Sequence, residues 1–266
     1  LPAIDLLQGH VTSARYQSWL TAIENFDPWT GFTRGMGDNN WNMIALAGEF
    51  AAYKLGLRTN INYVEQSVEA QGYRFTSRWG LYEDPDSPMA YDHFARIWVD
   101  EMMFYGDGYR GSHAADLKEV LRRASLTGMF MQSSTGQLPA GGRSNHHHWN
   151  EGMECMVQEI YARHALEAGD TVLAGMHKRS AHIALQALDK WIQSDYAMNP
   201  VRNYFDASLR FGFAPYGGTA YNLTMVSTLA LAYKHALYTE TVAEQYAPCE
   251  VGGFVVHFDD HMHKIF

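Results

Sequence analysis

The chain has 266 residues, of which 47% are hydrophobic, 18% charged and 14% aromatic. This composition excludes a disordered chain and allows one large domain or two small ones. The formal net charge is −9 with histidine neutral, so the chain has no general attraction to nucleic acid or to anionic membranes, and we expect neither as a partner.

Apolar residues at helical spacing predict an all-α protein. In chain order, the predicted helices cover residues 8–24, 42–56, 60–72, 89–105, 114–132, 150–168, 171–194 and 221–239. Gly56 and the pair Gly169-Asp170 are typical helix-termination signals. Residues 250–266 are more strand-like, with Phe254, Val255, Val256 and Phe258 close together. We therefore expect a helical domain over residues 1–249 and a β region that begins near residue 250.

Long polar loops precede several of these helices, at residues 30–41, 104–113, 133–149 and 203–220. Loops of this kind commonly carry function, so we expect them to meet at one face. The two cysteines do not make a disulfide framework. No apolar run reaches the roughly 18 residues that span a membrane. The sequence begins with Leu1 and not with an initiator Met. We therefore expect a processed chain that is periplasmic or secreted.

A run of three histidines, His146–His148, follows Arg143 and Asn145 and precedes Trp149. Zinc ligands are normally spaced so that they converge, whereas adjacent histidines point apart. We therefore expect no metal and no cofactor here. The simpler alternative is a histidine-rich loop that caps the helix at 150–168.

Two further segments are richer in functional side chains than local structure requires. Residues 38–42 contain an Asp, three Asn and Trp41, although one Asn would cap the next helix. Residues 214–222 place Tyr216 and Tyr221 on either side of Gly217-Gly218. A glycine turn with core tyrosines is the alternative for the second segment.

Together these three segments resemble heparinase II/III-like and alginate-lyase-like polysaccharide lyases. Asn145-His146 with Trp149 resembles the family's Asn-His-Gly-Thr-Trp motif, with His147-His148 in place of Gly-Thr. Residues 39–42 resemble its Asn-Asn-Trp-Asn helix start, and residues 218–222 its Gly-Pro-Ser-Tyr-His segment, which carries a catalytic tyrosine. The order along the chain also agrees. The resemblance implies an (α/α) toroid, an incomplete barrel of antiparallel helix hairpins.

The resemblance also implies cleavage of a uronic-acid polysaccharide or oligosaccharide by β-elimination. Such a site neutralises the sugar carboxylate, removes the C5 proton and protonates the departing O4. The implied catalytic residues are Asn145, His146, Tyr221, Tyr216 and Arg143. The implied substrate-binding residues are Asn40, Trp41, His147, Trp149, Arg110, Tyr109 and Glu151. Because the chain is acidic overall, these Arg and His residues must make the cleft locally positive.

Two alternatives stay open. A glycoside hydrolase needs two carboxyl groups across the scissile bond, and Glu151, Asp92, Asp107 and Glu83 are the candidates. A non-catalytic glycan-binding module needs only the aromatic residues. Lyase products absorb in the ultraviolet, which separates the three classes.

Overall fold

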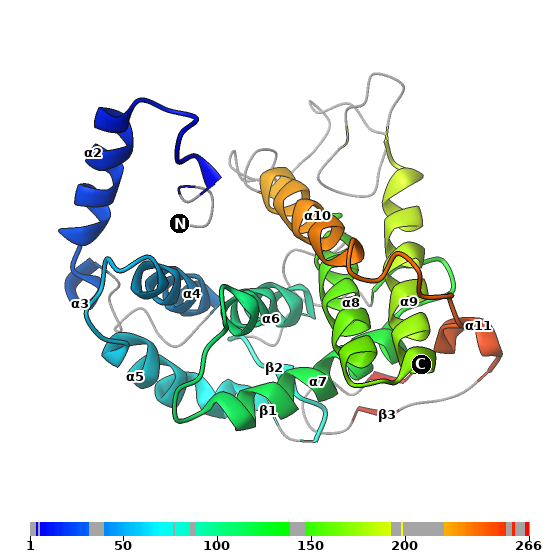
Figure 1. Cartoon of the computed structure of the whole chain (residues 1–266). Helices are drawn as coiled ribbons and strands as arrows, with labels where there is room; N and C mark the ends of the chain where they lie inside the picture. The colour runs from blue at the N-terminus through cyan, green and yellow to red at the C-terminus, as the bar shows by residue number, and fades with distance from the viewer. Residues whose placement is uncertain are drawn as a thin grey trace, which may run out of the picture. The chain divides into compact units, whose positions relative to one another are not determined.

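The computed structural model describes residues 4, 6–31, 40–76, 78–85, 89–138, 147–192, 198, 221–253, 257–258 and 264–265. The chain is mostly helical with almost no strand, so the predicted all-α class is confirmed. Its α-helices are α2 (Ser13–Glu24), α3 (Pro28–Gly31), α4 (Asn40–Lys54), α5 (Asn62–Gln71), α6 (Met89–Phe104), α7 (Ala114–Met131), α8 (Trp149–Glu167), α9 (Thr171–Asp189), α10 (Asn222–Ala236) and α11 (Pro248–Val251) (Figure 1). None of the described helices is both long and apolar enough to cross a membrane.

The remaining elements are short. The 3-10 helix η2 (Gly72–Arg74) leads into strand β1 (Phe75–Thr76), which pairs with β2 (Leu81–Tyr82). In the tail, β3 (His257–Phe258) pairs antiparallel with β4 (Lys264–Ile265), so that His257 stands opposite Ile265. These last two strands fall in the stretch expected to begin a β region.

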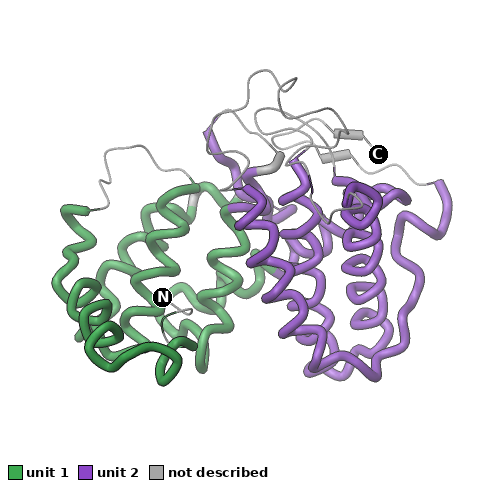
Figure 2. Tube along the Cα trace, turned by 90° about the horizontal axis from the view of Figure 1, so that it is seen from above, with its two compact units in different colours: residues 1–75, 95–121 green, residues 76–94, 122–266 purple. Residues whose placement is uncertain are grey.

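The chain divides into two compact units (Figure 2). Unit 1 comprises Leu1–Phe75 and Ala95–Leu121, and unit 2 comprises Thr76–Phe94 and Arg122–Phe266. Helices α6 and α7 each contribute residues to both units. The division is therefore not a simple cut of the chain into an N-terminal and a C-terminal half.

Within unit 1, α4 and α5 pack as a helix hairpin. The N–H of Leu57 donates to the carbonyl of Ala52 (2.9 Å), and Gly56 adopts a φ of +74°, which only glycine takes up without strain. The predicted helix end at Gly56 is thus confirmed. The hairpin core includes Phe50, whose ring meets that of Tyr109 edge-on with centroids 6.0 Å apart.

Within unit 2, α8 is the central helix, and 15 of its 19 residues are buried. Helices α9 and α10 both lie along it (Figure 1). The turn into α9 uses Gly169, with a φ of +83°, and Asp170, whose side chain accepts the N–H of Leu173 (2.9 Å). This confirms the predicted helix boundary at these two residues. Helix α10 approaches α8 closely at Gly152, where a Cβ would lie 3.0 Å from atoms of Met225 and Thr228.

Candidate functional site

The first turn of α8 and the first turn of α10 meet in unit 2. His147 precedes the N-cap residue of α8, and Tyr221 is the N-cap residue of α10; their rings pack edge-on with centroids 4.6 Å apart. Tyr221 also lies against Trp149, at 4.4 Å between centroids. Two segments that are more than seventy residues apart in sequence are therefore adjacent in space.

Trp149 anchors a larger group of rings, which we call the α8–α10 aromatic cluster: Tyr91, Phe94, His147, Trp149 and Tyr221. The centroid of Trp149 is 4.9 Å from that of Phe94 and 5.5 Å from that of Tyr91, both on α6. Trp149 is only 2% exposed, so its ring belongs to the core of unit 2 and not to a surface that substrate can reach. His147 is buried as well, whereas Tyr221 is half-buried. Tyr221 is the member of the cluster best placed to act on a ligand.

His148, Asn150 and Glu151 add polar groups to the same turn. His148 is the N-cap residue of α8, yet its side chain makes no capping hydrogen bond; instead its ring lies 5.7 Å from that of Trp191. Glu151 is 1% exposed and accepts the N–H of Leu138 (3.4 Å). Asn150 is 5% exposed, and within the described part of the chain its side-chain oxygen accepts no hydrogen bond.

Deeper in unit 2, five side chains form what we call the α8 polar network: Asp92, His93, Glu154, Gln158 and His177. Nε2 of His93 and Oε2 of Glu154 lie 2.6 Å apart and share a hydrogen. Nδ1 of His93 is 3.4 Å from Oδ2 of Asp92, and Oδ1 of Asp92 accepts the N–H of Tyr82 (2.6 Å). His93 therefore bridges two buried carboxyl groups.

Gln158 continues this network. Its amide N–H groups donate to Oε1 of Glu154 and to the carbonyl of Ser125, both at 2.9 Å. Its oxygen must then accept from Nδ1 of His177 (2.6 Å), which fixes the tautomer of that ring. Burial lowers the pKa of His177 to about 3, so the ring is neutral at neutral pH. The network ties α6, α7, α8 and α9 together inside unit 2.

His93, Glu154, Gln158 and His177 are not among the site residues predicted from the sequence. One signal could have indicated part of the set: Glu151, Glu154 and Gln158 follow one another at helical spacing, with apolar residues such as Met153, Met156 and Val157 between them. Polar side chains on one face of a buried helix need partners there, because unpaired buried groups are costly.

The substrate-binding residues expected in unit 1 have different environments. Trp41 is 68% exposed at the start of α4, so it is not a core residue, while the neighbouring Asn40 is buried. Tyr109 is 3% exposed and its hydroxyl donates to Glu65 (2.7 Å), which makes it a core residue rather than a substrate contact. Arg110 is largely exposed and lies 3.6 Å from Asp107.

Two carboxylates, Glu65 and Asp107, make hydrogen bonds and ion pairs with residues of the segment 104–113 and its neighbours. Partial burial raises the pKa of Glu65, but hydrogen bonds from Ser112 and Tyr109 outweigh it, and the pKa lies below its usual range. The Lys54 ammonium lowers the pKa of Asp107. Both carboxylates are therefore ionised at neutral pH and engaged in contacts within unit 1.

Four of the predicted catalytic residues lie outside the described residues: Arg143, Asn145, His146 and Tyr216. Among the residues that are described, no three His, Cys, Asp or Glu side chains are grouped as ligands of a metal ion would be. No protein-family model, curated protein or solved structure significantly matches the chain.

Proposed function

We propose that the chain cleaves a uronic-acid-containing glycan by β-elimination, on helix hairpins that belong to an (α/α) toroid. One observation carries the proposal: the contact between His147 and Tyr221 at the starts of α8 and α10. It pairs the middle residue of the histidine run with the tyrosine that follows the Gly-Gly turn. These are the two segments that a catalytic His–Tyr arrangement of this class requires to be adjacent.

The proposed chemistry divides into three tasks. Arg143 and Asn145, just before α8 in sequence, neutralise the sugar carboxylate and stabilise the enediolate that forms when the C5 proton leaves. His146 and Tyr221 transfer protons, one from C5 and one to the departing O4. His147 supports the ring of Tyr221 by packing against its edge.

Two of the four carboxyl candidates for hydrolysis, Glu151 and Asp92, are buried, which favours a lyase over a hydrolase that uses them. Hydrolysis requires two carboxyl groups that reach the substrate. Glu151 and Asp92 are 1% and 0% exposed, and both accept backbone N–H groups. A lyase does not need such a pair, because His and Tyr perform the proton transfers.

The test is a screen of uronate-containing glycans, read at the ultraviolet absorbance of the unsaturated product. We expect at least one polyuronate to give this signal, and Tyr221→Phe to lower its rate by about 10²–10⁴-fold, the usual contribution of a general acid or base. Phe keeps the ring that packs on Trp149, so the melting temperature should not change.

The matched control is Tyr233→Phe, which removes an exposed hydroxyl from the same helix, α10, and should leave the rate unchanged. A Tyr221→Phe protein with full activity would remove Tyr221 from the mechanism. Reducing ends without ultraviolet absorbance would indicate a hydrolase, and binding without any product would indicate a glycan-binding module.

A further inference from the structure

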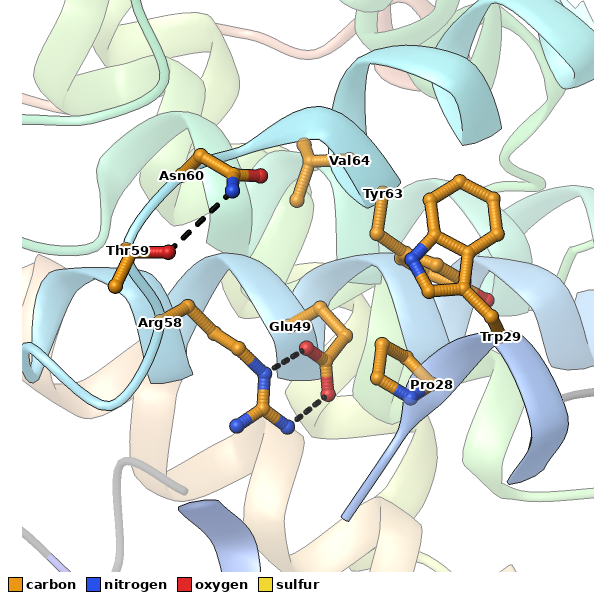
Figure 3. Close-up of a pocket in the computed structure, with 8 residues that line it drawn as sticks. All are labelled: Pro28, Trp29, Glu49, Arg58, Thr59, Asn60, Tyr63 and Val64. Atoms are coloured by element: carbon orange, nitrogen blue, oxygen red, sulfur yellow. Dashed lines mark hydrogen bonds and ion pairs between the residues drawn. The ribbon is translucent and has the colours of Figure 1, made fainter. Parts of the chain in front are cut away.

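Unit 1 contains a small pocket of about 150 Å³, between α3, the segment that precedes α5, and the facing sides of α4 and α5 (Figure 3). Its lining residues are Pro28, Trp29, Glu49, Arg58, Thr59, Asn60, Tyr63 and Val64. Figure 3 shows Trp29 and Tyr63 on one side and Thr59, Asn60 and Arg58 on the other. None of these residues belongs to the site proposed above.

The aromatic side of the pocket is held in place although it is open to solvent. Trp29 is 44% exposed, and its ring stands edge-on to that of Tyr63 with centroids 5.1 Å apart. Asp27 accepts the backbone N–H of Trp29 (3.0 Å), and Pro28 beside it is buried. An exposed indole that is fixed in this way offers a flat apolar surface at little entropic cost.

The charged groups of the pocket cancel one another. Arg58 donates to both carboxylate oxygens of Glu49, at 2.6 and 3.1 Å. Its other N–H groups reach the carbonyls of Ile23 (2.9 Å), Phe26 (3.0 Å) and Leu57 (3.0 Å). All five guanidinium hydrogens are therefore used, and none remains to bind an anion. A cation is equally disfavoured, because Arg58 neutralises Glu49.

Thr59 and Asn60 supply the groups that can still bind a ligand. The Asn60 oxygen accepts the N–H of Asn62 (3.0 Å), and one hydrogen of its amide reaches the Thr59 hydroxyl (3.4 Å). These two contacts do not use the second amide hydrogen of Asn60 or the hydroxyl hydrogen of Thr59, so both can donate to a ligand. The pocket thus combines a fixed indole with neutral hydrogen-bonding groups opposite it.

We infer that this pocket binds a single uncharged, hydroxyl-rich ring, such as one neutral sugar unit, with its apolar face on Trp29 and its hydroxyls on Asn60 and Thr59. The volume of about 150 Å³ lies below the ~300–1,000 Å³ of pockets for drug-sized ligands, which limits the occupant to a single small ring. The site is separate from the α8–α10 site and needs no turnover. Its ligand is neutral, unlike the polyuronate proposed as substrate.

The experiment is saturation-transfer NMR on the whole chain with four probes: methyl β-glucopyranoside, methyl β-galactopyranoside, glucuronate and tetramethylammonium. We expect at least one neutral glycoside to bind, and glucuronate and tetramethylammonium to bind at least about tenfold more weakly. Trp29→Ala should weaken glycoside binding about tenfold or more, and Asn60→Ala several-fold. The control Tyr246→Ala removes another exposed ring and should change nothing.

Several results would overturn the inference. These are the absence of binding by either glycoside, equal binding of glucuronate, or equal binding of tetramethylammonium, which would make the pocket a cation cage. Unchanged affinity in both Trp29→Ala and Asn60→Ala would place the glycoside elsewhere. Should Trp29→Ala destabilise the fold, the surface change Asn60→Ala decides alone. A chain that gives no unsaturated product can still pass this test, so the two proposals fail independently.

Discussion

Asn150, in the first turn of α8, is buried although its side-chain oxygen lacks a hydrogen-bond donor within the described residues. A buried acceptor in this state costs about 1–3 kcal/mol of stability. A role in binding or catalysis is one reason why such a group is retained. Asn150 directly follows Trp149, whose ring contacts that of Tyr221, so we propose that it serves the substrate site of the proposed lyase.

Replacing Asn150 with Leu should therefore separate stability from function. Because Leu has the same branching at Cγ and no polar atom, we expect the free energy of unfolding to stay the same or to rise by about 1 kcal/mol. Formation of unsaturated product should fall. Thermal melting and the absorbance assay measure the two effects.

Gln158→Leu is the opposing control for Asn150→Leu. It removes an amide whose hydrogen bonds are all made, and leaves Glu154 and His177 without their partner. We expect it to cost about 2–4 kcal/mol. If Asn150→Leu is as destabilising as Gln158→Leu, then Asn150 has a structural role and no place in the site.

Among the helices, α8 is stabilised by polar as well as apolar contacts. The α8 polar network links it to α6, α7 and α9 through hydrogen bonds of 2.6–2.9 Å. Gly128 on α7 leaves the room that this network needs: a Cβ there would lie 3.1 Å from Oε2 of Glu154 and 3.4 Å from Nε2 of His93.

Gly128→Ala should consequently destabilise unit 2, against the usual trend for helices. Alanine normally stabilises a helix by about 1 kcal/mol relative to glycine. Here the added methyl group pushes apart a buried hydrogen-bonded pair, and we expect a net loss of about 1–3 kcal/mol in chemical denaturation. Gly72→Ala is the control, because a Cβ there meets nothing within 4 Å. A stabilised Gly128→Ala protein would contradict the close packing described here.

The sequence predicted helices well because their signals are local. Apolar spacing and the glycines at 56 and 169 located α4, α8 and α9 to within a few residues, except at the C-terminal end of α9. The α8 polar network could not be predicted, since His93 and Glu154 are 61 residues apart and meet only through packing. The burial of Trp149 could not be predicted for a similar reason. It is the first residue of α8, and position at a helix start does not determine whether a side chain faces the core or the solvent.

Across the whole molecule, buried histidines determine how the fold responds to acid. Burial lowers the pKa of His177 to about 3 and that of His235 to about 4. In the unfolded chain both titrate near pH 6.5. Between these values the unfolded chain binds more protons than the folded one, so stability falls as the pH is lowered.

We expect the melting temperature to be constant above pH 7 and to decrease below about pH 6.5. His177 and His235 each contribute roughly 1.4 kcal/mol of lost stability per pH unit down to the folded pKa. His177→Gln should flatten the curve. Because the effect arises from burial, it should persist at about 0.5 M salt, where repulsion between surface charges is screened. A curve that is flat from pH 7 to pH 5 would contradict the assignment.

Arg58 fixes only the C-terminal end of helix α2, and this bears on which helix unfolds first. Helix α2 has no buried residue, and Arg58 holds the carbonyls of Ile23 and Phe26 at its C-terminal end. Amide protons of α2 should therefore exchange with solvent earlier than those of α8, and proteases should cleave there first. Since Pro28 and Trp29 form part of the neutral pocket, a ligand bound there should slow this local opening.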